Sequence, residues 1–255
     1  MEQIRFLDLA EYNAFTNMAI DEAIMRSIQA GQSPPTLRLY RWKPSAVSIG
    51  TFQGMTEEVD LEYCRTRGID YIRRITGGGA VYHDYEGEVT YSIILPRGHR
   101  LAPEDIIESY RILCKGIVKA LDYLGISSEF KPINDIVTGG KKISGNAQTR
   151  RYSCVLQHGT ILLDLDVEVM FSVLKVPQEK ISDKMIQDVK QRVTSVRDIL
   201  GEDITMHDLS QALRSGFAES LKVELDNGAL SATEAELANT LSNEQYRRDE
   251  WNLKR

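Results

Sequence analysis

The most informative segment of this chain reads Arg73-Arg74-Ile75-Thr76-Gly77-Gly78-Gly79-Ala80-Val81-Tyr82-His83-Asp84. Consecutive glycines let bare backbone N–H groups approach an anion without a Cβ in the way. Arginine supplies a planar donor fork that binds phosphate or carboxylate. Apolar residues before and after the glycines favour a strand on each side. The segment therefore predicts an anion-binding turn between two strands, although glycine runs are more often plain tight turns.

Two later segments carry further polar residues on expected strands. One reads Asn134-Asp135-Ile136-Val137-Thr138-Gly139-Gly140-Lys141-Lys142-Ile143-Ser144-Gly145-Asn146-Ala147-Gln148, which predicts a strand, a Gly-Gly hairpin turn and a short strand leading into a polar loop. The other reads Leu156-Gln157-His158-Gly159-Thr160-Ile161-Leu162-Leu163. Because side chains alternate along a strand, adjacent residues face opposite ways. Only one lysine of the pair, and only one of the two adjacent arginines, is therefore expected to reach a shared ligand.

In this order the three segments resemble the lipoate–protein ligase A family, within the wider superfamily of biotin and lipoate protein ligases and octanoyl transferases. The shared pattern is RR-x-[ST]-GGG-x-V-x-HD, then ND-I, then K-[IV]-[SA]-G-[SN]-A-x, then HG-[ST]-[IL]-L. The resemblance runs from about Phe6 to Leu163 and continues more loosely to Glu250-Trp251-Asn252. It is closest to the archaeal two-component type of catalytic domain.

Hydrophobic periodicity predicts one α+β domain, a mixed β-sheet flanked by helices, with a helical C-terminal extension. The resemblance makes this a biotin/lipoate ligase-like catalytic domain over 1–255, with a sheet-rich core over 1–166 and a mostly helical part over 167–255. The resemblance also implies that the C-terminal accessory domain of full-length relatives is absent and that a separate protein supplies it. Helices are expected at 13–29, 103–124, 167–174, 178–192, 206–221 and 232–245.

Composition excludes several other classes of protein. The net charge of −6 makes nucleic acid a poor partner. No run approaches the ~18 apolar residues that span a bilayer, and no signal segment is evident, so we expect a cytoplasmic protein away from membranes. The 3 cysteines are odd in number and widely spaced, which favours neither a zinc site nor a disulfide framework.

The resemblance implies ATP- and Mg²⁺-dependent activation of lipoate to lipoyl-AMP. The lipoyl group would then pass to a lysine on the lipoyl domains of 2-oxo acid dehydrogenase complexes or on the glycine-cleavage carrier protein. Lys142 is the expected catalytic residue, because its ammonium would stabilise charge at the acyl carbonyl and the α-phosphate. Asp135 is the expected Mg²⁺ ligand. A solvated lysine and an Asx turn are the ordinary structural alternatives for these two residues.

Most of the remaining site residues follow from the matched positions of the family motifs, whereas Trp42, Gly50 and Phe52 are expected because their strands flank these motifs. For ATP or the adenylate, the expected residues are Arg74, Thr76, Gly77, Gly78, Gly79, Ala80, Tyr82, Asn134, Asp135, Ala147, Gly159 and Thr160. For the lipoyl group, they are Trp42, Gly50, Phe52, Arg74, His83, Lys142 and His158. The sequence does not separate a pocket wall from ordinary core packing at the apolar positions.

Three other functions stay open. One is a lipoyltransferase that uses pre-formed lipoyl-AMP, and another is a non-enzymatic protein that binds lipoate or its adenylate. The third is an octanoyl transferase that forms a cysteine thioester, but no cysteine lies close before the Lys142 motif. Cys154 and His158 are four apart on an expected strand, which separates them by ~13 Å, far beyond the ~3 Å that base activation needs.

Overall fold

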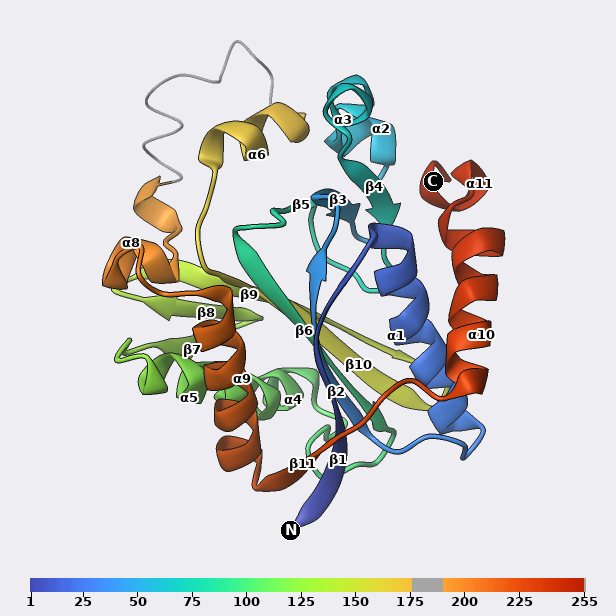
Figure 1. The fold of residues 1–255 in the computed structure, drawn as a ribbon, viewed down its shortest axis with the longest axis vertical. Helices are drawn as coiled ribbons and strands as arrows, with labels where there is room; N and C mark the ends of the chain where they lie inside the picture. The colour runs from blue at the N-terminus through green and yellow to red at the C-terminus, as the bar shows by residue number, and fades with distance from the viewer. Residues whose placement is uncertain (176–189, 255) are drawn as a thin grey trace.

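The computed structural model describes residues 1–175 and 190–254. An eight-stranded mixed sheet has the strand order β11-β1-β2-β6-β10-β9-β8-β7, and a three-stranded sheet has the order β4-β3-β5 (Figure 1). The strands of the large sheet are β1 (Glu2–Tyr12), β2 (Thr36–Trp42), β6 (Glu88–Pro96), β7 (Glu129–Lys131), β8 (Asp135–Thr138), β9 (Lys141–Arg151), β10 (Cys154–Leu162) and β11 (Val223–Asn227). Those of the small sheet are β3 (Ala46–Ile49), β4 (Asp70–Arg73) and β5 (Val81–His83). The expected mixed sheet with flanking helices is confirmed.

Helices cover both faces of the large sheet. On one face α4 (Ile106–Leu113), α5 (Lys115–Tyr123) and α9 (Met206–Leu221) pack over a core that includes Leu37, Leu39 and Ile93. On the other face α1 (Ala14–Gln29) and α10 (Ala232–Leu241) pack over a core that includes Tyr40 and Ile94. Neighbouring residues of β2 and β6 thus enter opposite cores, as the two-residue period of a strand requires.

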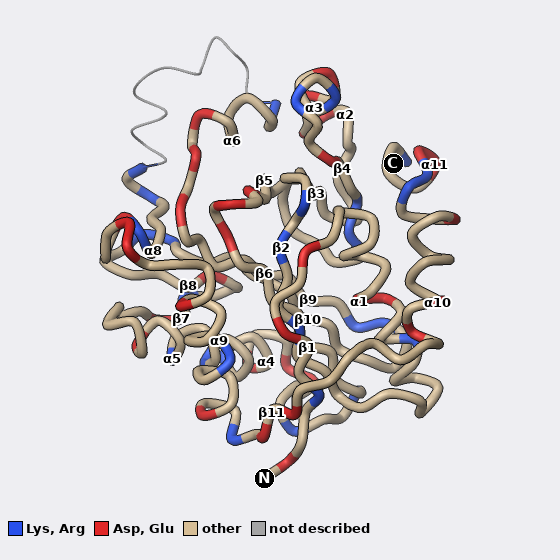
Figure 2. The backbone as a smooth tube through the Cα atoms, viewed as in Figure 1, with Lys and Arg blue, Asp and Glu red and all other residues tan. Residues whose placement is uncertain are grey.

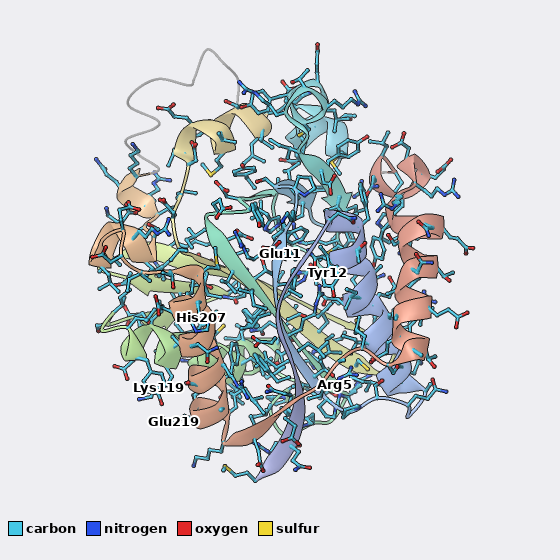
Figure 3. The ribbon with its side chains drawn as sticks, in the orientation of Figure 1. Arg5, Glu11, Tyr12, Lys119, His207 and Glu219 are labelled. Atoms are coloured by element: carbon cyan, nitrogen blue, oxygen red, sulfur yellow. The ribbon has the colours of Figure 1, made fainter. Side chains whose placement is uncertain are left out.

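Ion pairs and caps fix the helices locally. Lys119 of α5 pairs with Glu219 of α9 at 3.2 Å (Figure 3). Capping boxes begin α9 and α10, formed by Thr205 with Asp208 and by Ser231 with Glu234. Lys and Arg are interspersed with Asp and Glu along the tube of Figure 2. Within the described ranges, no helix combines the length and apolarity that crossing a membrane requires.

The shorter elements lie around the ends of the small sheet and along the C-terminal part. They are α2 (Met55–Glu58), α3 (Leu61–Arg67), α6 (Val167–Val173), α8 (Val196–Leu200), the π-helix at Ser242–Tyr246 and α11 (Asp249–Asn252). The expected helices at 13–29, 167–174, 206–221 and 232–245 are confirmed to within a few residues, the last continuing into the π-helix. The one expected at 178–192 lies almost wholly outside the described residues.

Two expectations about local structure are wrong. The helix expected at 103–124 is two helices that meet at Cys114, and the first begins after Asp105, whose side chain accepts from the Glu108 N–H. The polar loop expected after Lys142 is instead a continuous strand, because β9 pairs with β10 from Ser144 to Arg151. The part expected to be mostly helical also contains a strand that was not expected, β11, which pairs in parallel with β1 and so extends the large sheet.

Candidate functional site

A cavity of about 330 Å³ lies where the small sheet meets β2, β9, β10 and α6. All three motif segments contribute to its wall, although they are far apart in the sequence. The expected site residues that line it are Trp42, Arg74, Gly78, Gly79, Ala80, Tyr82, His83, Asn134, Lys142, Ala147, His158, Gly159 and Thr160. The topology therefore brings most of the sequence-derived candidates together around one space.

Five expected residues do not line this cavity, namely Gly50, Phe52, Thr76, Gly77 and Asp135. Phe52 is a correction to the expected acyl wall, because its side chain is 91% exposed on the turn after β3. Gly50 supports the glycine turn, since a Cβ there would lie 2.1 Å from the Gly78 carbonyl oxygen. Thr76 and Asp135 contact the wall residues His158 and Lys142, so they act one contact away from the cavity.

The two adjacent arginines point in opposite directions, as expected. Arg73 is bound to carbonyl oxygens of the C-terminal segment, including that of Trp251 at 3.1 Å and that of Asn252 at 3.1 Å. Trp251 returns a hydrogen bond from its indole Nε1 to the Arg73 carbonyl at 2.8 Å. Arg73 thus ties the chain end to the edge strand β4, and Arg74 faces the cavity.

Arg74 is a buried cation whose hydrogen bonds all go to neutral groups. Its guanidinium donates to the Thr76 hydroxyl, to the carbonyl and hydroxyl oxygens of Ser48, and to the carbonyls of Gly77 and Gly79. Among the residues described, none forms a salt bridge with it. Burial lowers the pKa of Arg74 to about 10, so its charge persists at neutral pH. A buried cation without an ionic partner favours the binding of an anion.

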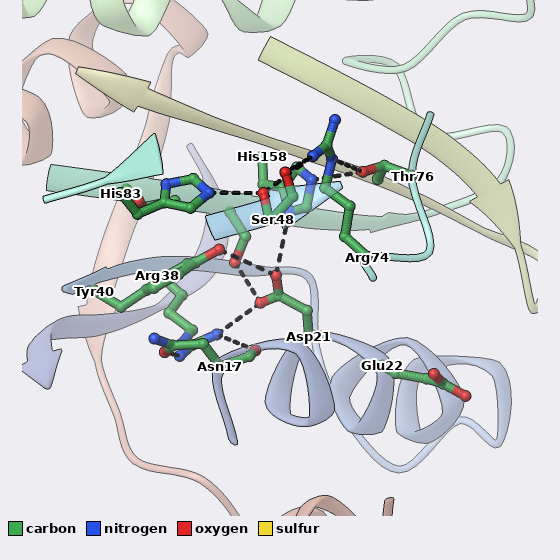
Figure 4. A network of polar contacts seen from close by, with 12 residues as sticks. Asn17, Asp21, Glu22, Arg38, Tyr40, Ser48, Arg74, Thr76, His83 and His158 are labelled. Atoms are coloured by element: carbon green, nitrogen blue, oxygen red, sulfur yellow. Dashed lines mark hydrogen bonds and ion pairs between the residues drawn. The ribbon is translucent and has the colours of Figure 1, made fainter. Parts of the chain in front are cut away.

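Two buried histidines flank Arg74 on the cavity wall (Figure 4). His83 contacts Glu88 through Nδ1 at 2.7 Å and Ser48 through Nε2 at 2.8 Å. Its ring stacks on Trp42 with 4.0 Å between centroids. His158 contacts Thr76 through Nε2 at 2.8 Å, and burial lowers the pKa of His158.

A buried ion pair beneath the wall was not foreseen from the sequence. Arg38 donates to Asp21 at 2.8 Å, and Asp21 also accepts from Ser92 at 2.8 Å (Figure 4). Burial alone would raise the pKa of Asp21, but the Arg38 guanidinium holds it below its usual value. Both residues sit on segments that read as an ordinary amphipathic helix and strand, so no sequence signal marked them.

Lys142 lies beside Asp135 with 2.6 Å between Nζ and Oδ1, on the paired strands β8 and β9. A register shift between Ile136 and Val137 interrupts this pairing. Both side chains are partly exposed, so the pair is accessible from the cavity. Within the described residues no group of three His, Cys, Asp or Glu side chains could hold a metal ion. Asp135 is thus a single carboxylate that already has a cationic partner.

Several wall residues were missed by sequence reasoning. Asn146 lies against Gly159, where a Cβ would come within 2.1 Å of its Oδ1. It accepts from the Tyr91 hydroxyl at 2.7 Å and donates to the Asn134 carbonyl at 2.9 Å. The other missed members are Tyr40, Ser48, Thr90, Gly145, Leu162, Leu165, Met170, Leu174 and Val193. Most of these are apolar, and their spacing resembles that of ordinary core residues.

The three cysteines all lie in the described part of the chain, and none of them lines the cavity. Each is buried. Burial raises the pKa of Cys64 and Cys154 to about 11 and that of Cys114 to about 12. Thiolate is the nucleophilic form of cysteine, so none of these side chains has the surroundings of a reactive thiol.

Comparison with known proteins places this site in a family. Residues 13–218 match the lipoyl protein ligase A/B catalytic domain. The octanoyltransferase LipM of Brevibacillus brevis is 36% identical over 278 residues, and that of Kyrpidia tusciae is 39% identical over 277 residues, with 100% of both chains covered in each case.

Solved structures agree with this match. The chain is 36% identical to a protein of the archaeal lipoylation system of Thermoplasma acidophilum, described as a bi-partite lipoate protein ligase and its E2 lipoyl domain. The TM-score is 0.88, and the match covers 99% of this chain and 96% of that one. A lipoate-protein ligase A bound with ATP is 34% identical with a TM-score of 0.84, covering 99% of each chain.

Proposed function

Because the chain belongs to the lipoyl protein ligase A/B catalytic domain family, we propose that it transfers a medium-chain acyl group, octanoyl or lipoyl, to a lysine of a lipoyl domain. The observation that carries this proposal is the unpaired buried guanidinium of Arg74 beside a cavity that also presents Lys142. Such cations suit the carboxylate, phosphate or developing oxyanion of an activated acyl group. The cavity volume of about 330 Å³ lies at the small end of the range for ligand pockets.

The source of the acyl group has two candidates, and the named relatives favour the first. The two relatives from Brevibacillus brevis and Kyrpidia tusciae are octanoyltransferases, which supports octanoyl transfer from a carrier thioester over the ATP-dependent ligase expected from the sequence. In this chain such a transfer would not pass through a cysteine of the cavity wall. The lysine of the acceptor would instead attack the thioester directly, with Lys142 polarising its carbonyl.

The second candidate is an acyl-adenylate formed from the free acid and ATP. It is supported by the presence of both Arg74 and Lys142 on the cavity wall and by the solved structure of an ATP-bound relative. Here Arg74 would face the carboxylate and Lys142 the α-phosphate. Asp135 would supply one ligand of an ATP-bound Mg²⁺, with phosphate oxygens completing the shell, because Mg²⁺ sites commonly use one or two carboxylates plus phosphates.

The acceptor and accessory proteins are also proposals. The archaeal relative is described with an E2 lipoyl domain and as bi-partite. We extend both features to this chain: a lipoyl domain as acceptor, and a separate small protein that assists activation. The glycine-cleavage carrier protein is a further acceptor to test.

One experiment separates these routes. Purified protein and a lipoyl domain are incubated with an octanoyl thioester of a carrier protein, with lipoate plus ATP and Mg²⁺, or with pre-formed lipoyl-AMP. Mass spectrometry then reads the acylated lysine. Acylation from the thioester supports octanoyl transfer, and acylation from lipoate and ATP supports the ligase. Acylation from lipoyl-AMP alone indicates that activation needs the accessory protein. No acylation from any donor refutes the proposed function.

A further inference from the structure

Arg74 is the meeting point of two chains of polar side chains with the same order of groups. In the first, Glu88 contacts His83 Nδ1 at 2.7 Å, and His83 Nε2 contacts the Ser48 hydroxyl at 2.8 Å. The same hydroxyl accepts from Arg74 at 3.0 Å. All four side chains are buried. The order is carboxylate, imidazole, hydroxyl and guanidinium.

The second chain reaches Arg74 from its other side (Figure 4). Asp21 lies 3.6 Å from His158 Nδ1, which is longer than a hydrogen bond. His158 Nε2 contacts the Thr76 hydroxyl at 2.8 Å, and that hydroxyl accepts from Arg74 Nε at 3.1 Å. Asp21 is also engaged by Arg38. The first chain is therefore the tighter one, and its carboxylate forms no ion pair with a lysine or arginine among the described residues.

With Glu88 ionised and His83 neutral, only one arrangement of protons satisfies the first chain. A guanidinium can only donate, so the Ser48 oxygen must accept from Arg74. The hydroxyl proton is then free to point at His83 Nε2, which must accept it through its lone pair. His83 consequently carries its proton on Nδ1, where the carboxylate of Glu88 accepts it. A carboxylate that orients an imidazole in this way fixes which nitrogen is protonated.

We propose that Glu88 is a positioning residue that holds Arg74 in place through His83 and Ser48, and this rests on the proposed function. A carboxylate in direct contact with Arg74 would neutralise the cation and compete with an anionic substrate group. Placing the carboxylate two side chains away offsets part of the cost of burying the cation and leaves no direct competitor. The guanidinium plane is thereby oriented before the acyl donor binds.

Glu88 has a second contact that the test must separate from this one. It accepts from the Thr90 hydroxyl at 2.9 Å, and Thr90 accepts from the Trp42 indole at 2.7 Å. A change at Glu88 could therefore act through the acyl wall. Determining which nitrogen of His83 is protonated distinguishes the two contacts of Glu88. The contact through Thr90 to Trp42 does not decide which nitrogen carries the proton.

The test compares Glu88→Gln with Glu22→Gln in the full chain. Glu22 is a control for burial, since it is equally buried and its contacts lie away from Arg74: it accepts from Tyr152 at 2.9 Å and Tyr246 at 2.5 Å and also pairs with Arg26 at 2.5 Å. For Glu88→Gln we expect kcat/KM for the active acyl donor to fall about 10- to 100-fold, the range seen when an outer hydrogen-bond partner is removed. KM for the lipoyl domain should stay unchanged. Glu22→Gln should leave the kcat/KM for the donor within about twofold of the wild type.

The second readout is the ¹⁵N NMR spectrum of the histidines, which reports the protonated ring nitrogen without any activity. Wild-type His83 should be the Nδ1–H form. An Nε2–H form would overturn the proposal, as would a kcat/KM for Glu88→Gln within about twofold of the wild type. An acyl adduct found on Ser48 would also overturn it, because Ser48 would then be a nucleophile. Wild-type protein inactive with every donor would refute the proposed function, whereas the NMR result would still judge the hydrogen-bonded chain.

Discussion

Replacing Lys142 by alanine should separate stability from activity. The pair with Asp135 has side chains 42% and 33% exposed, so solvent screens it despite the 2.6 Å contact. Pairs of this kind contribute about 0–1 kcal/mol, and the free energy of unfolding should fall by no more than that. Loss of a preorganised charge at the reacting carbonyl costs roughly 10²- to 10³-fold in rate, or about 2.7–4 kcal/mol. The effect on the barrier should thus exceed the effect on stability several-fold.

The assay measures acyl transfer to a lipoyl domain from the donor that the wild type uses, alongside urea unfolding of the same preparation. Lys141→Ala is the matched control, because Lys141 is the neighbouring cation on β9 and does not line the cavity. It should retain transfer within about twofold. Equal losses from the two substitutions would refute the assignment of Lys142. The assignment would also be refuted if Lys142→Ala lost activity only in proportion to a large loss of folded protein.

Three further outcomes follow from the structure. Gly50→Ala should lower transfer by roughly 10²-fold and also lower the melting temperature, because its Cβ, 2.1 Å from the Gly78 backbone oxygen, fits only if the glycine turn moves by about 1 Å; activity equal to wild type would contradict this. Alkylation with iodoacetamide at pH 8 should leave transfer intact, since burial raises the pKa of all three cysteines to about 11 or 12; rapid inactivation would indicate a cysteine intermediate. Because the pKa of His158 is lowered in the folded state, the unfolded chain binds the proton first, and the unfolding free energy should fall as pH drops below about 6.5. The His158→Gln variant should lose that part of the pH dependence in urea titrations.

The sequence predicted the parts of the site that depend on local patterns, such as glycine runs and the alternation of side chains along a strand. Strand alternation predicted that only one of the two arginines, and only one of the two lysines, faces a shared ligand, and the structure shows this separation. The resemblance to the family motif selected Arg74 and Lys142 as the residues that face it. The separation itself needs only the two-residue period of a strand, which tertiary packing rarely overrides.

The errors arose where long-range pairing decided the outcome. β11 formed inside a part expected to be mostly helical because β1 offers it a parallel partner, and no local pattern announces a partner that lies far away in sequence. Phe52 was placed in the acyl wall because its strand flanks the motifs, but the turn after β3 carries it outward. The apolar residues from α6 were missed because a leucine that lines a cavity and a leucine that fills a core have the same spacing.

The side chains that face the cavity say more about the acyl donor than overall sequence identity does. Relatives called octanoyltransferases and relatives called lipoate ligases are about equally similar to this chain, at 36% for the LipM of Brevibacillus brevis and 36% for the archaeal ligase. A transferase that uses a thiol intermediate needs an ionisable cysteine at the cavity, and the three here are buried elsewhere with raised pKa values. What the cavity does present is Arg74 and Lys142. Arg74 has no ionic partner among the described residues, whereas Lys142 is paired with Asp135, so a negatively charged donor would meet one unpaired cation and one that Asp135 already engages. The comparison of an octanoyl thioester with lipoyl-AMP as donors therefore tests the electrostatics of the site as well as its family assignment.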